Sequence, residues 1–252
     1  MMCAFISKNF KTIVICVALA ISSFFLNFSI YHSTNLKKPV IIENTTKKLI
    51  SILDKSILLA DSTIDAEKLH QLQTNYFIAR KHYKQIECFI EYCSPFDAKY
   101  FINGPLVKKS DLEIGTRIVD PHGFQVIEEQ LFGVDSIDTS LLLIELKLLK
   151  ESFNTFTHKL NTININDSQI LEMMQFELIR MSALTLNGYD ASFTKTNSEE
   201  CKNVFEGFRA LLNDVKVKNQ EKGYPLTLHQ QLISRLKLAE NYCLIHKHYD
   251  SF

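Results

Sequence analysis

The chain has 252 residues, and its 28 Lys and Arg side chains balance 28 Asp and Glu side chains, so the formal net charge is zero. Without a basic stripe, this balance argues against a nucleic-acid partner. Hydrophobic residues make up 46% and charged residues 22% of the chain, which is typical of globular rather than disordered proteins. Only 7 Gly and 5 Pro are present, too few for the frequent turns of an all-β protein, so the composition favours long helices.

The N-terminus carries the features of a targeting segment. Lys8 and Lys11 precede an uncharged run of 20 residues from Thr12 to Tyr31, which is long enough as a helix to span a bilayer core of about 30 Å. The preceding lysines favour a cytoplasmic N-terminus, with the rest of the chain outside the cytoplasm. We predict that residues 1–35 are a signal anchor or a cleaved signal peptide, and that residues 36–252 form a helical domain.

Two long helices are predicted to begin this domain, at 41–59 and 65–92, because apolar residues recur there at helical spacing. Asp65 can cap the second helix. Within that helix, Lys84 can pair with Glu87 or Glu91, which lie on neighbouring turns.

The stretch 96–120 is predicted to be irregular, with a strong turn signal at Asn103-Gly104-Pro105. Loops of this length are often functional or packed over another element. A short helix is then expected at 121–133, followed by a helix capped by Asp138. The later predicted helices cover 139–160, 167–187, 198–219 and 227–247. The expected fold is thus all-α, with about six long helices.

Four cysteines follow the predicted leader: Cys88, Cys93, Cys201 and Cys243. An oxidising compartment would permit disulfides, but their spacing encodes none. The sequence has no C-x-x-C, which gives no support to zinc-ribbon or thioredoxin-type chemistry, and no C-x-x-C-H for covalent haem. We therefore expect buried thiols and no catalysis by this chain alone.

Two polar clusters are candidate sites. Gln125 and Glu128 are three residues apart, so they share one helix face just after Gly123. They could help to hold a metal ion, although a neutral Gln is a poor ligand for transition metals; the alternative is a polar network at the helix start. Arg80 and Glu87, two turns apart, are expected to form a buried pair that joins helices.

Glu128 is expected to be mostly buried, because the segment follows a long loop and carries an apolar face. An isolated buried carboxylate is costly, so it needs a partner on another helix. We predict Arg80 as that partner.

Several segments resemble, in order, the imelysin-like N-terminal helical domain of bacterial di-haem cytochrome c peroxidases. The resemblance covers about residues 45–252, and its most specific block is 121–132, PHGFQVIEEQLF. The weaker matching segments are 79–87, 103–105 and 187–190. Imelysin-like bundles carry a Gly-x-His-x-x-Glu motif; Gly123 and Glu128 match its outer positions, whereas Gln125 replaces the His.

The resemblance implies an imelysin-like up-and-down helical bundle, periplasmic or anchored in the inner membrane, that accompanies a di-haem peroxidase domain. Haem c would belong to that peroxidase domain, and this chain would hold no cofactor. Its own role would be scaffolding or docking. The alternatives are a stand-alone imelysin-like periplasmic protein that binds iron, haem or another ligand, and an interaction bundle without a ligand.

Overall fold

The computed structural model describes residues 35–36, 39–107, 109–111, 117–219 and 226–245. These residues are mostly helical, with only short strand pairs, so the predicted all-α class is confirmed. In this part of the chain, no helix is both long and apolar enough to cross a membrane. The predicted targeting segment 1–35 lies almost entirely outside the described residues.

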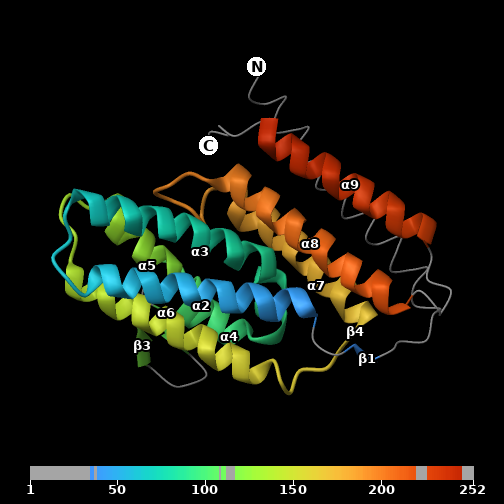
Figure 1. The fold of residues 1–252 in the computed structure, drawn as a ribbon, viewed down its shortest axis with the longest axis horizontal. Helices are drawn as coiled ribbons and strands as arrows, with labels where there is room; N and C mark the ends of the chain where they lie inside the picture. The colour runs from blue at the N-terminus through green and yellow to red at the C-terminus, as the bar shows by residue number, and fades with distance from the viewer. Residues whose placement is uncertain (1–34, 37–38, 108, 112–116, 220–225, 246–252) are drawn as a thin grey trace.

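The two predicted N-terminal helices are present almost as expected. Helix α2 covers Val40–Ala60 and α3 covers Ala66–Cys93. Asp65 caps α3 as predicted, accepting a hydrogen bond of 2.9 Å from the backbone N–H of Lys68. The turn between the helices is short, so α2 and α3 lie side by side and antiparallel (Figure 1).

The stretch 96–120 has more structure than predicted. Its first part is helical, as α4 (Pro95–Asp97) and the π-helical turn η1 (Ala98–Ile102). Later in the stretch, β2 (Lys109–Asp111) pairs antiparallel with β3 (Arg117–Val119). The prediction of an irregular loop was wrong here because Pro95 does not end the helical path. Proline is tolerated in the first turn of a new helix, where its missing N–H has no role.

The predicted short helix is split into α5 (Phe124–Glu128) and the π-helical turn η2 (Glu129–Gly133). Helix α6 (Thr139–Lys159) follows, and Asp138 caps it through a 3.0 Å hydrogen bond from the N–H of Leu141, as predicted. Strand β4 (Ile165–Asn166) pairs with β1 (Asn35–Leu36), so the start of the domain is tied to the entry of the next helix.

The C-terminal half consists of α7 (Asp167–Arg180), the π-helical turn η3 (Met181–Thr185), α8 (Asn197–Asn219) and α9 (Leu226–Ile245). Helix α3 is central: it contacts α2 on one side and both α7 and α8 on the other. Helix α6 packs beneath α2, and α9 lies along the outer side of α8 (Figure 1). The four cysteines after the leader are free thiols.

Helices α3 and α8 approach closely at Gly207. A Cβ atom there would lie 2.0 Å from the backbone carbonyl oxygen of Gln85 on α3. Only glycine leaves room for this approach, which brings the charged side chains of the two helices within hydrogen-bonding distance of each other.

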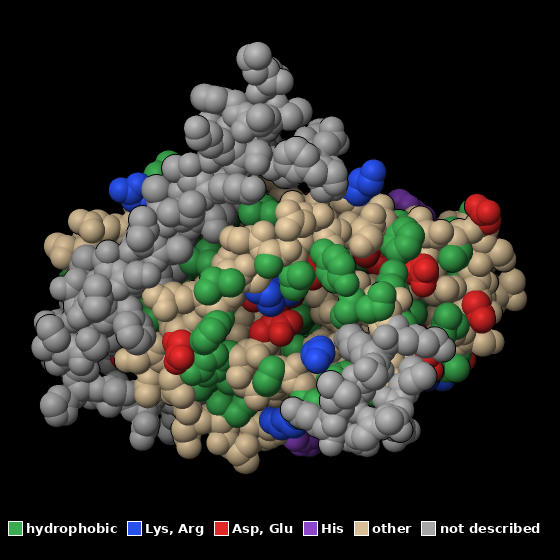
Figure 2. Space-filling model, turned by 180° about the vertical axis from the view of Figure 1, so that it is seen from behind, with side chains coloured by type: hydrophobic (Ala, Val, Ile, Leu, Met, Phe, Trp, Pro, Cys, Tyr) green, Lys and Arg blue, Asp and Glu red, His purple; other side chains and the backbone are tan. Residues whose placement is uncertain are grey.

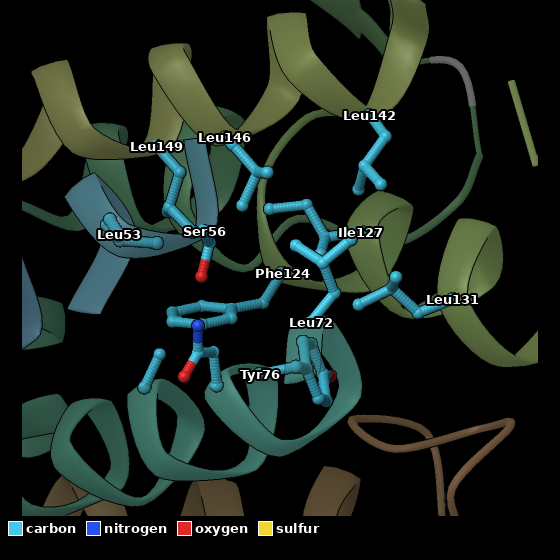
Figure 3. Close-up of a pocket in the computed structure, with 12 residues that line it drawn as sticks. Leu53, Ser56, Leu72, Tyr76, Phe124, Ile127, Leu131, Leu142, Leu146 and Leu149 are labelled. Carbon is cyan, nitrogen blue, oxygen red and sulfur yellow. The ribbon is translucent and has the colours of Figure 1, made fainter. Parts of the chain in front are cut away.

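The apolar core between α2, α3, α5 and α6 is nearly filled. Side chains from these helices converge around Phe124 and leave a small cavity beside it, of about 10 Å³ (Figure 3). That volume is at the lower limit for a single water molecule. The cavity is therefore a packing defect rather than a ligand site.

Candidate functional site

Arg80 on α3 is the centre of a buried ion network. Its guanidinium contacts Glu200 of α8 through both carboxylate oxygens, with Nε–Oε1 at 2.5 Å and NH2–Oε2 at 3.1 Å. It also donates to the side-chain oxygen of Asn103 at 2.6 Å and to the backbone carbonyl of Asp190 at 2.7 Å. One buried side chain thus joins α3, α8 and two loops.

Lys84, one turn further along α3, continues the network. Its ammonium group lies 2.8 Å from Asp190, 2.9 Å from Glu87 and 3.2 Å from Glu200. The predicted pairing of Lys84 with Glu87 is therefore present. Asp190 also accepts a 3.0 Å hydrogen bond from the hydroxyl of Thr185. The loop that contains Asp190 is thereby fixed against α3.

Arg180, at the end of α7, is the third cation of the network. Its guanidinium contacts Glu177 at 3.0 Å, Glu87 at 2.5 Å and Asp190 at 3.4 Å. Glu91 is more distant, at 4.0 Å. Arg180 therefore links α7 to α3, and four carboxylates share its single positive charge.

The network holds more negative than positive groups. Its cations are Arg80, Lys84 and Arg180, and its carboxylates are Glu87, Glu91, Glu177, Asp190 and Glu200. Buried charges of one sign without counter-charges are strongly unfavourable, so surplus carboxylates take up protons.

The pKa shifts show where these protons reside. Burial raises the pKa of Glu177 to about 8 and that of Glu91 to about 7, and Arg180 offsets only part of this effect. Burial also acts on Asp190, but Lys84 and Arg180 outweigh it and hold the pKa of Asp190 well below its usual range. Near neutral pH, Asp190 is therefore ionised and Glu177 carries a proton.

These shifts predict a stability that falls as pH rises from about 5 to 7. In this window the folded protein retains protons on Glu177 and Glu91 that the unfolded chain has released. Each retained proton lowers the free energy of unfolding by about 1.4 kcal/mol per pH unit. Glu177→Gln, which cannot ionise, should make this slope shallower in urea unfolding at pH 5.5, 6.5 and 7.5. The exposed Glu151→Gln is the matched control; an equal slope in both variants would contradict the assignment.

Gly123 holds the loop after η1 against α5. Its φ is +94°, and a Cβ atom there would lie 2.2 Å from the carbonyl oxygen of Ile102. It forms an isolated β-bridge with Asn103. Its N–H donates to Glu145 of α6 at 3.0 Å, and the same carboxylate lies 2.9 Å from Nδ1 of His122. Gly123 is thus a backbone contact point beside the ion network.

Glu128 is buried as expected, but its predicted partner was wrong. Its carboxylate accepts hydrogen bonds from the N–H of Thr194 at 2.9 Å and from the Thr194 hydroxyl at 2.6 Å. Arg80 is instead occupied by Glu200, a residue that only the packing of α8 on α3 brings close. Burial raises the pKa of Glu128, and the two bonds from Thr194 oppose that rise.

The candidate residues predicted from the sequence therefore do not form one site. Arg80 and Glu87 belong to the same buried network but do not pair with each other; each takes a different partner. Gln125 is buried on α5, and Glu128 is bonded to the loop before α8. Among the described residues, no group of three or more His, Cys, Asp or Glu side chains is placed to hold a metal ion.

Sequence reasoning missed the roles of Glu177, Arg180 and Glu200. Their spacing offered one clue: Glu177 and Arg180 are three residues apart on α7, as in helical ion pairs. Glu200 had no comparable indicator, since its partner lies 120 residues earlier in the chain.

Fold and site together define an all-helical protein whose central helix is tied to its neighbours by a buried ion network. In comparisons with known proteins, the sequence matches no protein-family model and no curated protein.

Proposed function

We propose that the chain is a non-catalytic helical companion of a di-haem cytochrome c peroxidase, with a scaffolding or docking role. In this proposal its fold is an imelysin-like bundle, and its N-terminal segment anchors it in, or exports it across, the inner membrane to the periplasm. The resemblance of the sequence motifs to those of the peroxidase-associated domain is the basis of the proposal.

One structural observation supports it. Residues from three resembling segments, 79–87, 103–105 and 187–190, are joined by hydrogen bonds: Arg80 donates to Asn103 and to the backbone of Asp190. The fourth segment contacts the same place through the bridge between Gly123 and Asn103. Segments spread over about a hundred residues thus meet at one buried centre, as expected if the resembling motifs share a structural role in this fold.

The direct test is to purify the tagged full chain from its own cells under gentle conditions. We expect a c-type protein with two covalent haems to co-purify with it, visible by haem staining and by its reduced-minus-oxidised spectrum. An equally tagged, unrelated membrane protein is the control.

The absence of any haem protein from repeated purifications would contradict the companion role. A rise of the melting temperature with iron or zinc that Glu128→Ala abolishes would instead favour the alternative, a stand-alone imelysin-like binding protein.

A further inference from the structure

A surface pocket of about 430 Å³ lies between the C-terminal half of α3 and α7. Its volume is in the range of small-molecule sites. Its lining residues are Cys88, Glu91 and Tyr92 from α3, and Met173, Phe176, Glu177, Ile179 and Arg180 from α7. Phe176 is 56% and Ile179 67% exposed, so the apolar wall of the pocket is open to a ligand from solvent.

Acidic residues outnumber basic ones in the pocket lining, with Glu91 and Glu177 against Arg180. Arg180 is the single cationic residue in its lining, and Glu87, Glu177 and Asp190 already surround that guanidinium. Glu91 lies 4.0 Å from Arg180 and is 26% exposed, so its carboxylate remains accessible. The pocket therefore has a place for a cation beside Glu91.

The protonation behaviour agrees with this geometry. Burial raises the pKa of Glu91 to about 7 and that of Glu177 to about 8, so both surplus carboxylates of the network line the pocket. A bound positive charge would stabilise their ionised forms. A bound anion would have to compete with carboxylates that already hold Arg180.

The remaining lining decides what kind of cation fits. The rings of Tyr92 and Phe176 lie 6.3 Å apart, and Met173 and Ile179 add apolar surface. Aromatic faces attract organic cations and also cover apolar groups. On the back of the molecule, hydrophobic side chains surround a small group of acidic and basic ones (Figure 2). An inorganic ion would leave the apolar part of the pocket lining unused.

We propose that this pocket binds a small organic ammonium ion, whose charged head pairs with Glu91 and whose apolar body lies against Tyr92 and Phe176. The proposal goes beyond the companion role and does not depend on it.

The test uses the full chain and 2-phenylethylammonium as the probe at pH 8, with binding followed by backbone amide chemical shifts. We expect saturable shifts centred on residues 88–92 and 173–180. Methylammonium, which lacks the apolar body, 2-phenylethanol, which lacks the charge, and 3-phenylpropanoate, which reverses it, should each bind at least about tenfold more weakly.

Glu91→Gln should weaken binding of 2-phenylethylammonium by about tenfold or more, since a charge-assisted hydrogen bond is lost. Phe176→Ala should also weaken it, whereas Glu151→Gln, on the exposed face of α6, should not. Both substituted pocket residues are partly exposed, and far-ultraviolet circular dichroism checks that the variants stay folded. The full chain carries a predicted membrane segment, so the measurement is made in detergent. Detergent micelles take up the same fraction of 2-phenylethylammonium for every variant, so differences between variants report the pocket.

Equal affinity for 2-phenylethanol and 2-phenylethylammonium would overturn the proposal, because the pocket would then recognise only an apolar body. Unchanged affinity in Glu91→Gln, or shifts that lie elsewhere in the molecule, would overturn it as well.

Discussion

Replacing Arg80 with Met should lower the free energy of unfolding by about 3–5 kcal/mol, because removal of one member of a buried ion pair leaves its partner charge uncompensated. Arg80 is 2% exposed and bonds Glu200, Asn103 and the backbone of Asp190. Methionine fills similar space but satisfies none of these acceptors. Urea unfolding, followed by circular dichroism at constant pH, measures the loss.

Arg209→Met is the matched control. Arg209 also forms a two-point contact with a glutamate, Glu240 of α9, but its side chain is 35% exposed. Because this pair is only partly buried, water can solvate part of the carboxylate that is left behind, so the loss should be smaller than for Arg80→Met. If Arg80→Met and Arg209→Met lowered the free energy of unfolding by the same amount, the buried network would contribute no more to stability than a partly exposed ion pair.

Gly123→Ala should lower the free energy of unfolding by a similar amount, about 2–6 kcal/mol. A residue with a Cβ atom is strained at φ +94° and ψ −147°, a region that essentially only glycine adopts, at a cost of about 1–3 kcal/mol. The new methyl group would also lie 2.2 Å from the carbonyl oxygen of Ile102, and relief of such an overlap costs about 1–3 kcal/mol more. Thermal and urea unfolding of the purified protein give the value.

Gly188→Ala is the comparison for backbone strain, since Gly188 also has a positive φ, of +75°. It lies in a different loop, outside the contact between Gly123 and Ile102. We expect the Gly123 variant to lose more stability than the Gly188 variant. An equal or smaller loss at Gly123 would mean that the loop after η1 can shift away without cost.

The helices could be predicted from the sequence because their determinants are local. Apolar periodicity places α2, α3, α6 and α8 within one or two residues of their observed ends, and Asp65 and Asp138 cap as expected. The close pair Lys84 and Glu87 follows from helix geometry for the same reason. The helical start of 96–120 was missed because Pro95 was expected to end the helical path, whereas proline is accepted in the first turn of a new helix.

The partners of buried charges could not be predicted in this way. Both Glu128 and Glu200 could have satisfied Arg80 on chemical grounds. The choice depends on how closely α8 approaches α3, and Gly207 sets that distance through its contact with Gln85. Such a contact joins residues 122 positions apart, and no local pattern encodes it. Asp190 was part of a recognised motif, but its link to Lys84 and Arg180 required the fold.

The most direct test of the central claim, that a buried ion network joins the central helix α3 to its neighbours, is a double-mutant cycle between Arg80→Met and Glu200→Gln. Unfolding free energies of the wild type, both single variants and the double variant give the coupling energy between α3 and α8. We predict a coupling of about 1.5–3 kcal/mol, as for a charge-assisted hydrogen bond. Additive effects, with a coupling below about 0.5 kcal/mol, would contradict the network.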